Sequence, residues 1–108
     1  MAKLVKMIKL NNLQYNPNRD PQVYRRCVGE PFRIQASIDG EGTARVTLAN
    51  TADGTRLAEG RVMLPASYTQ ELRFPSPGTR MVTLSIEGEG QKFTQDLRLD
   101  VMEHALAG

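Results

Sequence analysis

Tryptophan is absent from this sequence, and cysteine and histidine occur once each, as Cys27 and His104. A single cysteine cannot form an internal disulfide, so the chain must rely on a hydrophobic core, which fits a reducing compartment. Two soft ligands cannot complete a structural zinc site. A catalytic cysteine–histidine pair needs contact between the two side chains and a third group that orients the imidazole. We expect no such pair, and therefore no enzyme.

Long apolar runs are also missing, because no stretch approaches the roughly 20 residues needed to cross a bilayer. Lys3, Lys6 and Lys9 interrupt the apolar residues at the start of the chain, whereas a signal peptide places its charges before an unbroken apolar stretch. We therefore expect no membrane partner, and a cytoplasmic location if Met1 is the natural start. No glycine-rich phosphate motif occurs either, so we expect no cofactor.

The net charge of +2 is small, but its distribution is uneven. Residues 1–33 hold seven basic and two acidic residues, a net charge of +5, and residues 34–108 carry −3. A basic segment of this kind either meets an anionic partner or packs against the acidic part of its own chain.

What the sequence does contain is a repeated alternation of apolar and polar residues. Such a two-residue period sends one set of side chains into a core and the other into water, as half-buried β-strands do. Six segments show it: Phe32–Asp39, Thr43–Ala49, Ala58–Leu64, Tyr68–Phe74, Val82–Glu87 and Phe93–Val101. Within the third of these, Gly60 has no side chain to pack.

Residues typical of turns separate these segments. Residues 39–42 and 87–90, which both alternate an acid with glycine, predict tight hairpin turns, and residues 50–54 predict a longer hairpin loop. Residues 75–78, with two prolines, predict a rigid crossover between sheets. The segment Lys3–Leu10 fits an edge strand better than a helix, its lysines discouraging edge-to-edge association. Residues 11–31 read as an irregular loop, with a short strand between Val23 and Val28 as an option, and 102–108 as a tail.

The sequence from Val28 to Val101 resembles bacterial immunoglobulin-like domains, which include fibronectin-III-like modules. Residues 28–34 (VGEPFRI) resemble the entry into the second strand of such domains, residues 77–86 (PGTRMVTLSI) their penultimate strand, and residues 93–101 the last. Arg80 and Met81 stand where a tyrosine is usual, and the missing tryptophan excludes the cysteine–tryptophan core of antibody domains. The resemblance implies adhesion, spacing or protein recognition without shared catalytic residues.

Together these patterns predict one all-β domain over residues 1–108, a two-sheet antiparallel immunoglobulin-like sandwich of about seven strands. Two loops at one end of such a fold would bring four carboxylates together, and Ca²⁺ takes six to eight oxygen ligands. Ordinary exposed hairpin turns use the same residues, and we favour that interpretation. The residues concerned are Asp39, Glu41, Glu87 and Glu89.

We expect a non-catalytic binding or structural module that acts on a protein partner of unknown identity. Strand addition at an exposed edge is a suitable mode, because backbone hydrogen bonds supply affinity without a sequence motif. The same edge would also allow self-association. The alternative is an anion- or nucleic-acid-binding protein that uses the basic N-terminal third, although no nucleic-acid-binding motif is present. The candidate contact residues are Lys3, Lys6, Lys9, Arg25 and Arg26.

Overall fold

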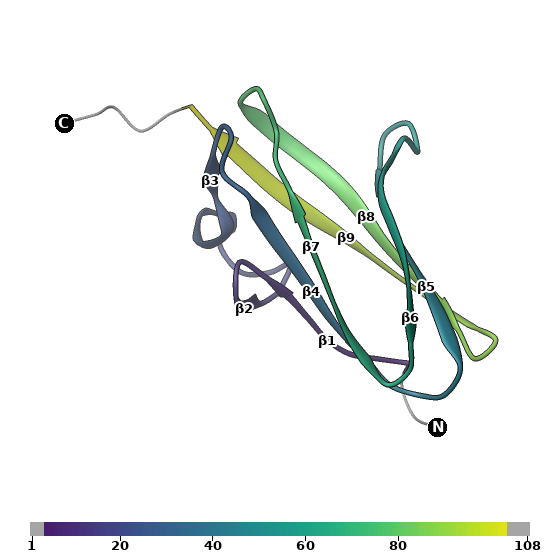
Figure 1. Ribbon diagram of the computed structural model, residues 1–108. Coiled ribbons are helices and arrows are strands. Elements are labelled where there is room, and N and C mark those ends of the chain that lie inside the picture. The colour runs from purple at the N-terminus through teal and green to yellow at the C-terminus, as the bar shows by residue number, and fades with distance from the viewer. Residues whose placement is uncertain (1–3, 104–108) are drawn as a thin grey trace.

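A computed structural model describes residues 4–103, and this part of the chain forms two β-sheets without an α-helix (Figure 1). The all-β prediction is therefore confirmed. One 3₁₀-helix, η1 (Pro21–Tyr24), lies among the strands. The strands are β1 (Val5–Leu10), β2 (Leu13–Gln14), β3 (Arg26–Cys27), β4 (Phe32–Ile38), β5 (Thr43–Asn50), β6 (Arg56–Met63), β7 (Ala66–Leu72), β8 (Gly78–Gly88) and β9 (Gln91–Met102).

The smaller sheet has four strands in the order β2-β1-β4-β7, all antiparallel. Strands β4 and β7 pair over their full length, from Phe32 opposite Leu72 to Ile38 opposite Ala66. A bulge in β1 shifts its register against β4 between Val5 and Met7.

The larger sheet has five strands in the order β3-β9-β8-β5-β6 and is curled like half of a barrel. Its centre is the long hairpin of β8 and β9, which pair from Gly78 opposite Val101 to Gly88 opposite Gln91. Only β3 runs parallel to its neighbour, over two residues of β9. The chain crosses from the smaller to the larger sheet between β7 and β8, as the prolines of residues 75–78 predicted. It also crosses at residues 39–42, so the hairpin predicted there is wrong: β4 and β5 belong to different sheets and do not pair.

The inward-facing residues of both sheets form one hydrophobic core. The alternation read from the sequence is confirmed in β4, β5, β7, β8 and β9, where the inward positions are the more buried ones, and in weaker form in β6, where the inward positions are half-buried. In β6, the structure explains why the inward position 60 is occupied by a glycine. A Cβ there would lie 2.8 Å from Cε1 of Tyr68, so the glycine leaves room for a tyrosine ring from the opposite sheet.

Residues 11–31 are more ordered than the predicted irregular loop. Asn11 and Asn12 both adopt positive φ (54° and 70°), the conformation of the tight turn that joins β1 to β2. The optional strand between Val23 and Val28 is confirmed only for Arg26–Cys27. The prediction missed β2, η1 and the turn because segments of two to four residues are too short to show a period.

Tyr24, at the end of η1, fixes this segment to the rest of the molecule. Its ring is buried and stacks 5.3 Å from that of Tyr15, and its hydroxyl donates to the carbonyl of Gln14 (2.7 Å). The buried side chain of Asn11 donates to the Tyr24 carbonyl (2.7 Å) and accepts from the backbone N–H of Arg33 (2.9 Å). Side-chain hydrogen bonds thus replace the ladder that a longer strand would supply.

Within Lys3–Leu10, residues 5–10 form β1, so the strand is confirmed there and the helical alternative is wrong. The prediction that this strand lies at the sheet edge is only partly correct, because β2 is the outermost strand and lies beside β1. Strand β2 covers only Lys9 and Leu10, which leaves the first half of β1 at the edge. The end of β9 at Met102 extends into the expected tail, and Lys3 lies outside the described residues.

Candidate functional site

On one side of the molecule, the edges of both sheets lack a full-length neighbour. In the smaller sheet, Tyr15 donates its N–H to the Ile8 carbonyl (2.8 Å), and β2 pairs no residue of β1 before Lys9. In the larger sheet, β3 pairs with β9 only at Val101 and Met102. Much of β1 and β9 therefore remains available as exposed strand edge.

The hairpin register fixes which backbone groups of β9 point away from β8. A two-residue turn at Glu89 and Gly90 closes the hairpin, so Gln91 and every second residue after it bond to β8. Lys92, Thr94 and Asp96 therefore direct their N–H and C=O groups outward. At the next such position, the N–H of Arg98 donates to the Tyr15 hydroxyl (3.1 Å). An outward N–H of this edge can thus donate a hydrogen bond to a group that is not part of the sheet.

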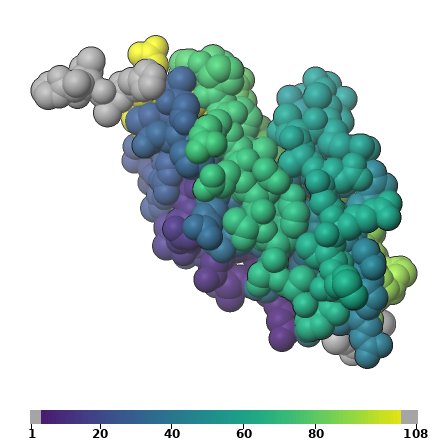
Figure 2. All heavy atoms as spheres, viewed as in Figure 1, coloured from purple at the N-terminus to yellow at the C-terminus, as the bar shows by residue number. Residues whose placement is uncertain are grey.

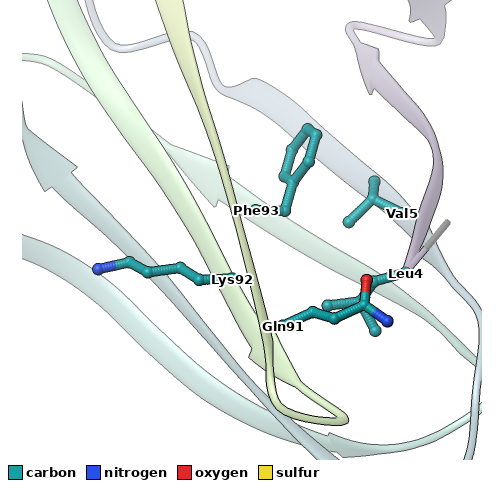
Figure 3. A pocket seen from close by; sticks show the side chains of 5 residues that line it. All are labelled: Leu4, Val5, Gln91, Lys92 and Phe93. Atoms are coloured by element: carbon teal, nitrogen blue, oxygen red, sulfur yellow. The ribbon is translucent and has the colours of Figure 1, made fainter.

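Between these two edges lies an opening with apolar walls. A cavity of about 320 Å³ is lined by Leu4 and Val5 from the start of β1 and by Gln91, Lys92 and Phe93 from β9. In Figure 3, Val5 and Phe93 lie on the two sides of the opening, whereas Lys92 extends away from it.

A second cavity of about 170 Å³ continues along β1 and also borders Val5 and Phe93. Because the two share these residues, we treat them as one feature, the β1–β9 groove. It is lined by Leu4, Val5, Lys6, Met7, Ile8, Gln14, Tyr15, Gln91, Lys92, Phe93 and Gln95.

The predicted basic contacts do not gather at one place. Lys6 lines the β1–β9 groove and forms an exposed ion pair with Asp39 (3.5 Å). Lys9 is exposed on β1, next to β2.

Arg25 and Arg26 are both half-buried, at the start of β3. Both make local hydrogen bonds: Arg26 donates through Nη1 to the Arg25 carbonyl (2.8 Å), and Arg25 donates its N–H to the Gln22 carbonyl (3.3 Å). Neither residue lines the β1–β9 groove.

The four carboxylates considered for Ca²⁺ come from loops that do meet at one end. A Cβ at Gly40 would collide with the Glu89 carboxylate, so the β4–β5 and β8–β9 turns are in contact. Asp39, however, is paired with Lys6. Among residues 4–103 no three acidic, histidine or cysteine side chains are placed to hold a metal ion. The two turns therefore show no metal centre.

Of the residues that line the groove, only Lys6 was a candidate contact from the sequence, and two of the others show why the rest were missed. Phe93 and Gln95 occupy inward positions of β9, and the alternation placed Phe93 in the core. In the structure both are only half-buried because no strand of the smaller sheet covers them. The signal that identifies them is the missing neighbour beyond β9, which requires the strand order.

Of the cysteine–histidine pair considered from the sequence, the structure describes only Cys27. Cys27 is half-buried, and its backbone N–H donates to Oε1 of Glu30 (2.7 Å). His104 lies outside the described residues.

Within residues 4–103, no helix has the length and apolar character needed to cross a membrane. No protein-family model matches the sequence, and no curated protein matches it.

Proposed function

We propose that this protein is a non-catalytic interaction module of immunoglobulin-like fold that binds an extended segment of another protein in the β1–β9 groove. The observation that carries the proposal is the row of outward backbone groups at Lys92, Thr94 and Asp96, next to apolar Val5 and Phe93. An unpaired edge supplies main-chain hydrogen bonds to an added strand, and adjacent apolar pockets select alternate side chains.

The strand order supports the immunoglobulin-like part of the proposal. In such folds the second and fifth strands share one sheet, and the third, sixth and seventh share the other. When only strands of six or more residues are counted, the second and fifth are β4 and β7, which share the smaller sheet. The third, sixth and seventh are β5, β8 and β9, which share the larger sheet. Two features fit this fold less well: the larger sheet is curled, and the fourth long strand, β6, lies in the larger sheet instead of beside β7 in the smaller one.

The chemistry of the groove indicates what the segment contains. Leu4, Val5 and Phe93 favour apolar side chains at every second position. Lys92 extends away from the opening (Figure 3), and Lys6 is paired with Asp39, so the groove selects by apolar contact and not by charge. We therefore expect an extended segment with apolar side chains at alternate positions.

The alternative, binding of anions or nucleic acid through the basic third, has less support. Lys6 is paired with Asp39, and Arg25 and Arg26 are half-buried beside their own backbone. A phosphate-binding surface needs several free cations on one face.

A single substitution tests strand addition at this edge. Thr94→Pro removes an outward N–H while keeping the ladder to β8, and proline is tolerated on the open side of an edge strand. Random linear dodecapeptides displayed on phage and selected on the wild-type protein should bind Thr94→Ala with unchanged affinity. They should bind Thr94→Pro at least tenfold more weakly, because a backbone hydrogen bond is lost and the added strand is obstructed.

Two results would count against the proposal. Selected peptides that bind Thr94→Pro and Thr94→Ala equally well do not use this edge. If the wild-type protein dimerises in sedimentation experiments and Thr94→Pro does not, the occupant of the groove is a second copy of this chain.

A further inference from the structure

The opposite side of the molecule contains a second opening, between strands β6 and β7. These are the last strands of their respective sheets, so each has an unpaired edge. They are joined by the short connection at residues 64–65 and diverge toward their other ends (Figure 1). Figure 2 shows the result as a notch between the teal atoms around the β5–β6 turn and the green atoms that follow β7.

A cavity of about 230 Å³ lies in this notch and has mainly apolar walls. Leu57, Phe74, Met81 and Val82 line it, and the residues Leu57 and Met81 are 38% and 41% exposed. We call this cavity and its walls the β6–β7 cleft. Its volume suits one large apolar side chain together with a carboxylate, and is too small for an extended ligand.

The cleft contains one cation, Arg80, at a position where the strand otherwise turns apolar side chains inward. Arg80 lies on the same face of β8 as the buried residues Val82, Leu84 and Ile86. Its guanidinium lies 5.5 Å from the centre of the Phe74 ring, which holds the charge against an apolar surface.

The hydrogen-bonding capacity of Arg80 is only partly used. Its Nη2 donates to the carbonyl of Ser76 (2.9 Å) and to the Ser76 hydroxyl (2.6 Å). Its Nε is buried without a hydrogen-bond partner in the part of the chain described, and no carboxylate of residues 4–103 forms an ion pair with it. Arg80 as a whole is half-buried, so its guanidinium remains accessible from the cleft, and such a cation favours a carboxylate, which accepts charge-assisted hydrogen bonds.

We propose that the β6–β7 cleft binds the C-terminal carboxylate of a peptide whose last side chain is apolar. Arg80 holds the carboxylate, and Leu57, Phe74 and Met81 surround the side chain. The open edges of β6 and β7 beside the cleft offer main-chain groups to the preceding residues, which favours a peptide over a free acid. This site is separate from the β1–β9 groove and does not depend on it.

The test uses three probes on the isotope-labelled protein, followed by NMR of the methyl groups of Leu57 and Met81. The first is the acetylated tetrapeptide threonine–valine–threonine–leucine, the second is its C-terminal amide, and the third is 4-methylpentanoate. We expect saturable methyl shifts with the acid peptide and at least tenfold weaker binding of the amide. We also expect at least tenfold weaker binding of 4-methylpentanoate, which lacks the peptide backbone.

Arg80→Leu should abolish binding of the acid peptide while leaving an apolar side chain against Phe74. Arg33→Leu is the matched control, since Arg33 is exposed on β4 of the other sheet and does not line the cleft, so this variant should bind the peptide as the wild type does. If Arg80→Leu does not fold, the comparison of acid and amide on the wild type still decides.

Equal binding of acid and amide would overturn the carboxylate assignment, and so would absence of methyl shifts with every probe. Binding of 4-methylpentanoate as tight as that of the peptide would overturn the peptide occupant and identify a small-acid site.

Discussion

Tyr24 holds residues 11–31 in place through both ends of its side chain. Its ring is buried against Tyr15, while its hydroxyl donates to the Gln14 carbonyl and accepts from the N–H of Asn16 (3.1 Å). Breaking such a bond leaves a backbone carbonyl without its partner, which costs more than the bond itself contributes.

Tyr24→Phe should therefore lower the free energy of unfolding by about 1–2 kcal/mol, measured by urea denaturation. Tyr68→Phe is the control. The Tyr68 hydroxyl donates only to the side chain of Gln70 (3.2 Å), which can turn to solvent, so its loss should cost less than about 0.5 kcal/mol. Equal losses in the two variants would contradict the anchoring role of Tyr24.

Gly60 and Tyr68 form a matched pair across the two sheets. Gly60→Ala would place a Cβ 2.8 Å from Cε1 of Tyr68 and should destabilise the protein by about 1–3 kcal/mol through overpacking. In a Tyr68→Leu background the ring is gone, and the same substitution should be neutral or stabilising by about 0.4–1 kcal/mol. Thermal melts of the wild type, the two single variants and the double variant measure this change of sign. If Gly60→Ala destabilised the protein equally with and without the Tyr68 ring, the ring would not be the obstacle.

At the scale of strands, the pairing of β5 with β6 includes a charge cluster on the outer face. Glu59 on β6 accepts from Nε of Arg45 on β5 (2.7 Å) and from Nη1 of Arg56 (2.8 Å). The hydrogen bond from Arg45 is the main cause that holds the pKa of Glu59 below its ordinary value of 4.5. Because the folded state prefers the charged carboxylate, the stabilising contribution is complete above about pH 4.5 and is lost as the pH falls through the lower, folded-state pKa.

Arg45→Gln should raise the pKa of Glu59 toward 4.5, measured by NMR titration of its carboxyl carbon. Arg98→Gln, which removes a cation from another strand of the same sheet, should leave the titration of Glu59 unchanged. A Glu59 pKa that is the same in the wild type and in Arg45→Gln would show that this pair does not persist in solution.

The two faces of strand β9 differ in backbone hydrogen bonding as well as in side chains. Thr94→Pro removes an outward N–H and should cost no more than about 1 kcal/mol, whereas Gln95→Pro removes a bond to β8 and should cost about 3 kcal/mol or more. Urea denaturation of both variants measures the difference. Similar losses would mean that the outward side of β9 is already paired.

The sequence predicted those elements whose alternation is long enough to define a face. Strands β4, β5, β8 and β9 were found because Ile34, Val46, Leu84 and Leu97 occupy inward positions among polar neighbours. Strand β8 proved longer than expected, because Arg80 breaks the apolar series while keeping its direction. Strands β2 and β3 depend on tertiary contacts of Tyr24 and Met102, which no local pattern contains.

For the molecule as a whole, strand order decides where binding can occur. The sheets close over one core and extend to 50 × 25 × 21 Å, with openings on both sides. The sequence pointed to the strand edge at Lys3–Leu10, and the structure adds β9 as its counterpart across the groove. Phe93 and Arg80 acquire their significance only from this order: the sequence placed Phe93 among the core residues, and it placed Arg80 just before a predicted strand.

The central claim is that the outward edge of β9 is unpaired in the free protein and becomes paired when a segment binds. Amide hydrogen exchange, resolved by NMR, tests it most directly. The amides of Lys92, Thr94 and Asp96 should exchange at least tenfold faster than those of Phe93, Gln95 and Leu97, and should slow at least tenfold when a peptide selected from the phage library is added. Slow exchange of all six amides in the free protein would contradict the account, and so would unchanged exchange in the complex.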